Sequence, residues 1–305
     1  MDESGSVITA RDGPALVLGG GGVLGAFQAG FLKALFRTGF TPSMIVGTSA
    51  GALNGAFMAF RPDNDGADAL VRIWQGLRGR QLFFFNPMRV AFQIMSGGLC
   101  LARNDLLQTL VERNVAVDDF AATAVPLYIT TTNLTQARKQ VFHEGPVSRA
   151  VLASAAVPGI FCPIEIEGDL HIDGGVVANL DVETAIDLGA TEVIAVDLSR
   201  CMDGRRPSNL AALLMQTLDV VQRQRVDHDA TALASRARIT LLQPSPDGGF
   251  GLGDLANVDR LLEDGERMGE AALSLCMGAD GRMKPGVIHD PWHLHEWPSA
   301  PGPLP

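Results

Sequence analysis

The chain has 305 residues, of which 47% are hydrophobic and 19% charged, and its formal net charge is −10 at pH 7. This composition predicts a folded chain with a large buried core and excludes disorder over most of its length. The negative charge disfavours a nucleic-acid-binding protein, because no general basic field would attract phosphates.

The cysteines and the N-terminal segment bear on the cellular compartment. Cys100, Cys162, Cys201 and Cys276 are far apart and form no CxxC pair, so we expect buried thiols and neither a zinc site nor a disulfide framework. The first residues are acidic and polar, unlike a secretory signal, and no run of 18 apolar residues would span a membrane. We therefore expect a soluble cytoplasmic protein; the sequence leaves its oligomeric state open.

Strand-like and helical patterns alternate along the chain, which is typical of an α/β fold with a mostly parallel central sheet and helices on both faces. Between the predicted strands at 170–172 and 193–198 we expect a short helix, with Asp181 as its N-cap and Gly189 just past its C-terminal end. We predict strands at residues 15–18, 44–46, 127–132, 141–143, 170–172 and 193–198, and helices at 26–38, after 51 and at 148–155.

The domain boundaries follow from where these patterns stop. Residues 1–13 are expected to be a flexible N-terminus and residues 14–280 a single α/β domain, which includes helical patterns at 209–237 and 255–276 and a late strand at 239–242. Residues 281–305 form a proline-rich C-terminal tail that we expect to be extended or mobile.

A glycine-rich segment, GGGGVLG at residues 19–25, follows the first strand and opens a helix. Glycine lets the backbone turn tightly and direct several N–H groups at one oxygen, and the helix N-terminus favours negative charge. We therefore predict an anion or oxyanion site in this loop. Because Gly20, Gly22 and Gly25 also match GxGxxG, a nucleotide- or phosphate-binding protein is the alternative.

The end of the second strand separates these two hypotheses. A dinucleotide-binding fold would have an acidic residue there, but this chain has GTSAG, from Gly47 to Gly51. GxSxG at a strand-to-helix turn exposes a nucleophilic serine, here Ser49. The alternative without a catalytic role is a serine that caps a helix.

Ser49 needs a base within hydrogen-bond reach of its proton. Three histidines, His289, His293 and His295, lie in the tail, and a metal site there is disfavoured. His143 and His171 fall in predicted strands, and His228 falls in a charged helical stretch. None has a supporting motif, yet an acyltransferase or esterase with a histidine-containing triad stays open.

Asp173, followed by Gly174 and Gly175, is the remaining candidate base. It follows a strand, so its carboxylate is expected at the same sheet edge as Ser49. Partial burial would raise its pKa and make it a better base. An aspartate in an ordinary turn is the alternative interpretation.

Taken in order, the glycine loop, GxSxG and DGG resemble the patatin-like phospholipase family over about residues 14–200. Residues 153–161, ASAAVPGIF, also look like the family's segment before the aspartate. The resemblance implies a three-layer α/β/α sandwich and a Ser49–Asp173 dyad that cleaves carboxylic esters of phospholipids or related lipids. It also implies an oxyanion hole in the glycine loop, at Gly20, Gly21, Gly22 and Val23. It implies no cofactor and no metal.

The chain departs from the family pattern at two places. Bacterial members often have an arginine before the last glycine of the loop, where this chain has Leu24, and an Asn-Pro segment after DGG, where it has Ala178-Asn179-Leu180. Neither position belongs to the dyad.

Residues 72–103 contain no acidic residue but contain five arginines, with Trp74 and the run of Phe83, Phe84 and Phe85 among them. This pattern suggests peripheral contact with an anionic membrane. Alternatively, the phenylalanines are core and the arginines a solvated rim. The arginines are Arg72, Arg78, Arg80, Arg89 and Arg103.

Overall fold

The computed structural model describes residues 13–78, 95, 98–102, 105–114, 118–199, 206–207, 210–244, 255–289, 293–295 and 297. In these residues the main sheet has ten strands in the order β12-β11-β10-β9-β1-β2-β4-β8-β7, with β5 also paired to β4. The strands are β1 (Ala15–Leu18), β2 (Ile45–Thr48), β4 (Leu127–Asn133), β5 (Arg138–Phe142), β7 (Ile164–Ile166), β8 (Asp169–Asp173), β9 (Glu192–Val196), β10 (Arg238–Gln243), β11 (Gly286–His289) and β12 (His293–His295).

The centre of the sheet is parallel and its edges are antiparallel. The pairs from β11 through β10, β9, β1 and β2 to β4 are all parallel. Strand β12 runs antiparallel to β11 at one edge, and β5, β8 and β7 form antiparallel pairs at the other. The carboxyl ends of β1 and β2 therefore meet at one edge of the sheet, where ligands bind in open α/β folds.

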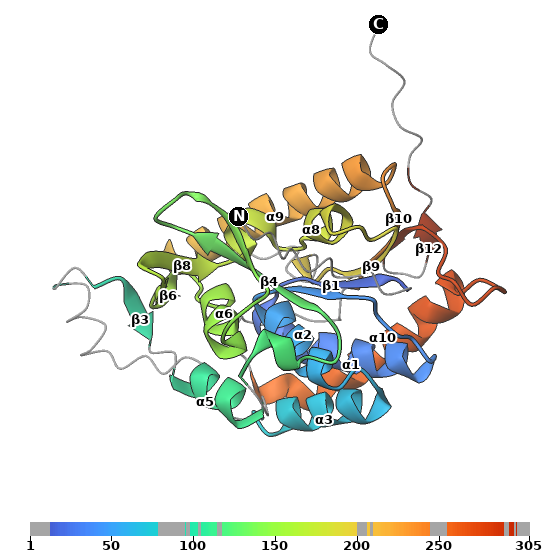
Figure 1. Ribbon diagram of the computed structural model, residues 1–305, viewed down its shortest axis with the longest axis horizontal. Helices are drawn as coiled ribbons and strands as arrows, with labels where there is room; N and C mark the ends of the chain where they lie inside the picture. Colours follow the sequence, from blue (N-terminus) through green and yellow to red (C-terminus); the bar gives the residue numbers. More distant parts are fainter. Residues whose placement is uncertain are drawn as a thin grey trace, which may run out of the picture.

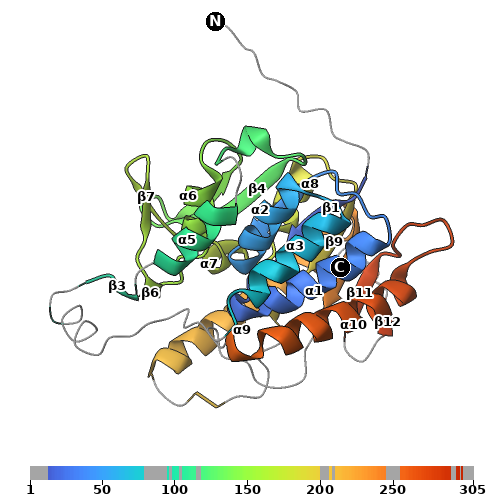
Figure 2. The same ribbon diagram turned by 90° about the horizontal axis from the view of Figure 1, so that it is seen from below.

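Helices cover both faces of the sheet, which confirms the predicted three-layer α/β fold (Figure 1). One layer contains α8 and α9, and the opposite layer contains α1, α2, α3 and α10; Figure 2 shows α3, α1 and α10 side by side. The helices are α1 (Gly25–Arg37), α2 (Ala50–Phe60), α3 (Asn64–Gln75), α5 (Asp105–Asn114), α6 (Val147–Ser154), α7 (Gly175–Ala178), α8 (Val182–Asp187), α9 (Leu210–Leu233) and α10 (Val258–Cys276).

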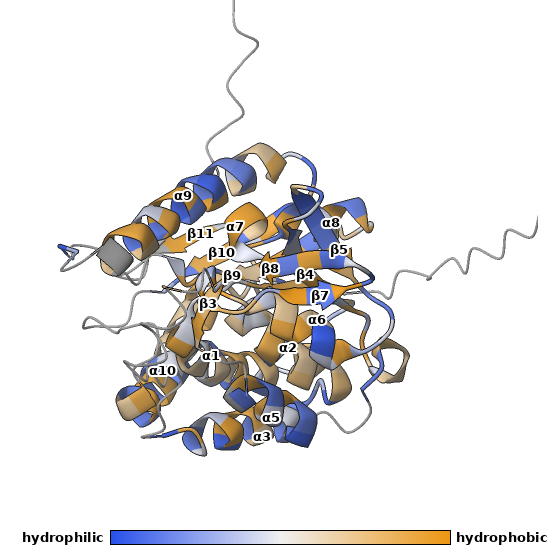
Figure 3. Cartoon of the chain, turned by 90° about the vertical axis from the view of Figure 1, so that its left-hand side faces the viewer, coloured by the Kyte–Doolittle hydropathy of each residue, from blue (hydrophilic) through white to orange (hydrophobic). Residues whose placement is uncertain are grey.

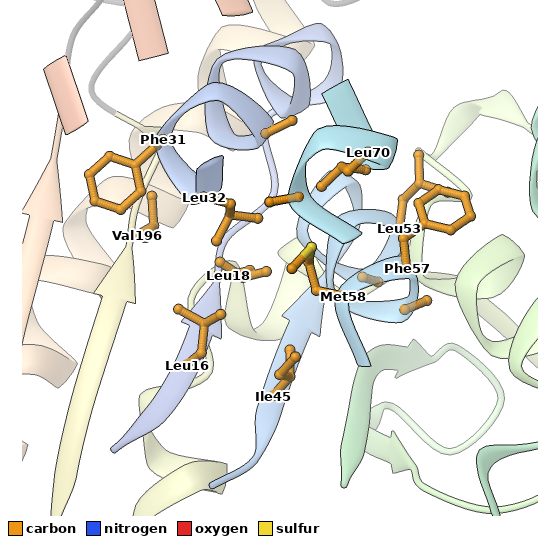
Figure 4. Packing of buried hydrophobic residues seen from close by; sticks show 14 of the residues in the cluster. Leu16, Leu18, Phe31, Leu32, Ile45, Leu53, Phe57, Met58, Leu70 and Val196 are labelled. Carbon is orange, nitrogen blue, oxygen red and sulfur yellow. The ribbon is translucent and has the colours of Figure 1, made fainter. Parts of the chain in front are cut away.

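The strands at the centre are buried on both faces, as expected for a covered parallel sheet. All four residues of β1 are fully buried, and they alternate between two cores. Leu16 and Leu18 point toward α1 and α2 and pack with Leu32 and Met58 (Figure 4). Val17 belongs to the opposite core, with residues of α8 and α9. Figure 3 shows the consequence: the strands and α2 are mostly hydrophobic, whereas α3 and α9 are mixed.

Most predicted elements match the structure to within a few residues, including the short helix α8. The Asp181 carboxylate accepts a hydrogen bond from the Thr184 N–H, which confirms the N-cap, and Gly189 has φ +98° after the helix. The elements that were not predicted include the helices α3, α5 and α7 and the strands β7, β3 (Cys100–Ala102) and β6 (Gly159–Phe161). The three strands have only three residues each, which give no readable period.

The sheet continues past the boundary that we predicted at residue 280. Within the segment assigned to the tail, β11 pairs in parallel with β10, and β12 pairs with β11. The side chain of Ile288 is 3% exposed. Pro285 and Pro291 lie on either side of β11 and not within it, so the prolines do not remove hydrogen bonds from the strand.

The cysteine prediction is wrong for two of the four residues, because Cys100 and Cys162 form a disulfide. Strands β3 and β6 pair in parallel as a separate two-stranded sheet, with Cys100 opposite Gly159. This pairing brings together two residues that are 62 positions apart, and their spacing gave no sign of it. Cys276 is a buried free thiol, as predicted, and Cys201 lies outside the described residues.

Within the part of the chain that the structure describes, we find no helix with the length and apolar character needed to cross a bilayer.

Candidate functional site

Ser49 lies in the sharp turn between β2 and α2. Its backbone has φ 54° and ψ −119°, an uncommon conformation for a residue with a side chain and one that persists only where the surroundings enforce it. The two motif glycines permit the turn: a Cβ at Gly47 would lie 2.6 Å from the Gly51 carbonyl oxygen, and one at Gly51 would lie 2.1 Å from the Leu18 oxygen. GTSAG therefore forms the predicted strand–turn–helix context.

The structure brings Asp173 to Ser49, although 124 positions separate them. The Ser49 Oγ–H donates to Asp173 Oδ2 at 2.7 Å, and the Gly175 N–H donates to Asp173 Oδ1, also at 2.7 Å. Asp173 is the last residue of β8. This strand runs antiparallel to β4, and Asp173 lies opposite Thr131. A Cβ at Gly174 would lie 2.2 Å from the Thr130 carbonyl oxygen, so this glycine allows β8 to end close against β4.

The environment makes Asp173 a stronger base than an exposed aspartate. The residue is 6% exposed, and burial raises the pKa of its carboxyl group to about 6. The hydrogen bonds from Ser49 and Gly175 act in the opposite direction, because they stabilise the ionised form. The carboxylate is therefore mostly ionised at neutral pH, but its affinity for a proton is higher than that of an exposed aspartate.

The glycine loop lies against this pair. A Cβ at Gly20 would be 2.9 Å from the Ser49 Cβ. The Gly20 N–H, which we predicted as an oxyanion donor, donates to the Asn179 carbonyl oxygen at 3.2 Å and is therefore already paired in this structure. Gly22 has φ +59°, which favours glycine, and begins a 3-10 turn that ends at Leu24. Gly21, Gly22 and Val23 open that turn, where N–H groups have no partner within the helix.

A buried polar network that the sequence did not reveal holds the loop in place. The Gln28 side chain donates to the Gly19 carbonyl oxygen, and the Asn54 amide donates to the Gly25 carbonyl oxygen and to Gln28 Oε1. The Trp74 indole N–H donates to Asn54 Oδ1 at 2.9 Å. A helical polar residue gives no local sign of such contacts, so a pattern search could not find them.

Two further residues that our sequence analysis did not assign hold the elbow and the loop. Ser154 Oγ accepts from the Ser49 N–H at 2.8 Å and donates to the Thr130 carbonyl oxygen at 2.7 Å. The Asn179 side chain donates to the Gly20 carbonyl oxygen at 3.4 Å. Asn179 is the central residue of the segment that departs from the family's Asn-Pro pattern, and it binds Gly20 through both backbone and side chain.

The three described candidate histidines have other partners. His171 is 2% exposed and shares a hydrogen bond with Thr131 Oγ1 at 3.1 Å, and burial lowers its pKa. His143 is exposed, with its ring near Tyr128, and His228 is exposed beside Asp229. None of these imidazoles is hydrogen-bonded to Ser49, so the structure provides no triad through them.

Ser49 and Asp173 open into a pocket with mostly apolar walls. Leu24, which stands in place of the arginine of many bacterial relatives, lines it, and so do side chains from α2, α3, α5 and α9. A serine hydroxyl bonded to a carboxylate of raised pKa can attack an electrophilic carbon in such a pocket. A carboxylate this close to the glycine loop would repel a phosphate bound in the loop but not a neutral ester carbonyl, which disfavours the nucleotide-binding alternative. The described side chains in the walls include Leu53, Leu77, Leu107, Leu110, Met215 and Leu218.

The proposed membrane-contact segment is only partly described. Arg80, Arg89, Arg103 and Phe83 to Phe85 lie outside the described residues. Trp74 is 4% exposed and bonded to Asn54, so it is a core residue and not an interfacial aromatic. Arg78 forms an ion pair with Asp259 of α10.

Comparison with known proteins gives a family match and several relatives. The family model "Patatin-like phospholipase" matches residues 16–186. The chain is 33% identical over 188 residues to "Lysophospholipase nte1" of Aspergillus terreus and 31% identical over 186 residues to "Patatin-like phospholipase domain-containing protein 7" of Mus musculus. These alignments cover 62% and 60% of this chain but only 12% and 13% of those much longer proteins.

A solved structure, VipD from Legionella pneumophila, superposes over 85% of this chain and 66% of its own, with a TM-score of 0.42 and 13% sequence identity. The family model, in contrast, covers more than half of the chain and includes the loop, the elbow and the aspartate. The chain therefore belongs to the patatin-like phospholipase family.

Proposed function

We propose that this protein is a lipid acyl hydrolase that cleaves carboxylic esters through a dyad of Ser49 and Asp173. The observation that carries the proposal is the 2.7 Å hydrogen bond from Ser49 Oγ to a buried carboxylate, at the wall of an apolar pocket. Family membership and the lysophospholipase named among the relatives support an ester of a phospholipid or related lipid as substrate.

The chemistry proceeds in two halves. Ser49 Oγ attacks the ester carbonyl carbon while Asp173 Oδ2 takes the hydroxyl proton, and the alcohol leaves with that proton to give an acyl-serine. Water then attacks the acyl-serine, gives its proton to Asp173, and releases the fatty acid as Ser49 regains its hydrogen. Since one carboxylate accepts and returns the proton in both halves, no other side-chain base is needed.

Backbone N–H groups of the glycine loop would stabilise the oxyanion that forms in each half. Gly21, Gly22 and Val23 are the candidate donors, because they open the 3-10 turn and Gly20 is already bonded to Asn179. The helix that follows adds a favourable dipole. One such donor is commonly worth about a hundredfold to a thousandfold in rate.

Helix α9, and not Trp74, is proposed to contact the membrane surface that contains the substrate. Leu213, Leu214, Val220 and Val221 are 49%, 58%, 57% and 55% exposed. A spacing of seven residues is about two turns, so the two pairs share one side of the helix. Leu218 of the same helix lines the pocket from the other side of the helix. An exposed apolar face of this kind suits contact with a membrane surface.

The direct test is hydrolysis of a monoacyl phospholipid by purified wild-type protein, Ser49→Ala and Asp173→Asn. We expect each substitution to lower kcat by at least about a thousandfold, as found for members of such catalytic units. Asp169→Asn, at the other end of β8 and outside the pocket, is the matched control and should retain activity, as should His171→Gln. Hydrolysis by Ser49→Ala at the wild-type rate would refute the proposal. Loss of hydrolysis in a folded His171→Gln variant would favour a triad.

A further inference from the structure

An acidic side chain lies in the pocket without a role in the dyad. Asp219, in the N-terminal half of α9, lines the same pocket as Ser49 and Asp173. Its Oδ2 is the one buried side-chain oxygen or nitrogen without a hydrogen-bond partner in the described part of the chain. Buried polar atoms are nearly always paired, so an atom of this kind in a pocket is available to interact with a polar or charged group of a substrate.

The position of Asp219 relative to the dyad follows from its neighbour Gln222. A Cβ at Gly175 would lie 2.7 Å from Gln222 Nε2 and 3.0 Å from Asp173 Oδ1, so the Gln222 amide lies beside the catalytic carboxylate. Asp219 precedes Gln222 by three residues on the same face of α9, a rise of about 4.5 Å along the helix. Asp219 and Gln222 therefore lie on the same face of α9, and both line the pocket that contains Ser49 and Asp173.

The walls of the pocket differ in their polar content. The wall formed by α2, α5 and the residue Leu77 after α3 presents Leu53, Leu77, Leu107 and Leu110 and is suited to an acyl chain, whereas α9 contributes Asp219 and Gln222 beside Met215 and Leu218. Helix α9 lies in the opposite layer of the fold (Figure 1). With the ester carbonyl at Ser49, this arrangement would direct the acyl chain toward the leucines and the alcohol portion toward Asp219.

We propose that Asp219 binds a positive charge on the alcohol portion of the substrate, so that esters of cationic alcohols are preferred over neutral ones. This inference rests on the proposed hydrolase function. A charge pair gains more from attraction in a partly dehydrated pocket than in water. Burial raises the pKa of Asp219 to about 6, and no other described residue contributes to this shift, so the carboxylate is mostly ionised at pH 8 and able to pair with the substrate.

The test compares two esters that differ in charge but hardly in shape. Butyrylcholine carries a quaternary ammonium, and 3,3-dimethylbutyl butyrate has a carbon atom in place of that nitrogen. We measure kcat/KM for both at pH 8 with the wild-type protein, Asp219→Asn and Asp229→Asn. The last variant removes the same charge from the same helix at a position outside the pocket, so it controls for the general field of the protein.

The wild-type protein and Asp229→Asn should favour the choline ester by about tenfold, a modest value for a close charge pair. Asp219→Asn should lower that ratio to about one, mainly through KM for the choline ester. Equal kcat/KM for the two esters in the wild-type protein, or a ratio that Asp219→Asn leaves unchanged, would overturn this inference and leave the hydrolase intact. Hydrolysis of neither ester would count against the proposed function itself.

Discussion

The buried carboxylate of Asp173 should lower the stability of the protein, and this cost can be measured through its pH dependence. The pKa of Asp173 is raised from 3.8 to about 6 in the folded chain. The folded state therefore binds more protons than the unfolded state between these values, so stability falls as pH rises through that window. At pH 8 the cost is about 3 kcal/mol, and at pH 4.5 it is about 1 kcal/mol, from linkage with these two pKa values.

Replacing Asp173 by asparagine removes this titration and keeps the shape. The new amide can accept from the Gly175 N–H and donate to Ser49 Oγ, so both contacts of the carboxylate have counterparts. We expect the free energy of unfolding of Asp173→Asn, relative to the wild type, to increase by about 2 kcal/mol between pH 4.5 and pH 8. Any altered hydrogen-bond strength adds an offset that does not depend on pH.

Urea unfolding followed by tryptophan fluorescence at several pH values measures this difference. Ser49→Ala is the matched control, because it keeps the carboxylate. Its pH slope should equal or exceed that of the wild type, since the Ser49 hydrogen bond lowers the pKa of Asp173. A stability difference between Asp173→Asn and wild type that stays constant from pH 4.5 to pH 8 would refute the reasoning.

Three other predictions concern the pH dependence of activity, the contacts of Ser154 and the exposed face of α9. The base must be ionised, so kcat/KM for a neutral ester should be constant above about pH 6 and fall about tenfold per pH unit below it, and a profile without that fall contradicts Asp173 as base. Ser154→Ala should lower the free energy of unfolding by about 2 kcal/mol, because the Thr130 carbonyl and the Ser49 N–H lose their buried partner; a thermal melt measures this, and an unchanged melting temperature argues against the contact. A double variant, Leu214→Ser with Val221→Ser, should reduce sedimentation with phospholipid vesicles more than it reduces hydrolysis of a monomeric ester, whereas equal sedimentation would remove α9 from the membrane-contact proposal.

The sequence predicted the catalytic candidates because each has a local signature. GTSAG predicts its own turn, since the glycines at both ends permit close backbone approach, and the structure has Ser49 in that turn. The DGG segment follows a strand, and strand ends of an α/β sheet meet at one edge. The order of the motifs along the chain and their local chemistry were thus enough to predict that Ser49 and Asp173 lie close together.

The supporting residues could not be predicted in this way. Ser154 and Asn54 act through tertiary contacts with backbone atoms of distant segments, and a single polar residue in a helical pattern resembles any other. The same holds for Asp219, whose missing partner becomes visible only when α9 lies beside the pocket. The disulfide between Cys100 and Cys162 depends on the pairing of two three-residue strands that have no readable period.

Labelling with a fluorophosphonate probe tests the central claim most directly, because the probe forms a covalent bond only with an activated serine. We expect wild-type protein to be labelled on the peptide that contains Ser49, Ser49→Ala to be unlabelled, and Asp173→Asn to be labelled at least about a hundredfold more slowly, within the range for loss of a catalytic base. Labelling that persists in Ser49→Ala, or that proceeds at the wild-type rate in Asp173→Asn, would contradict the dyad.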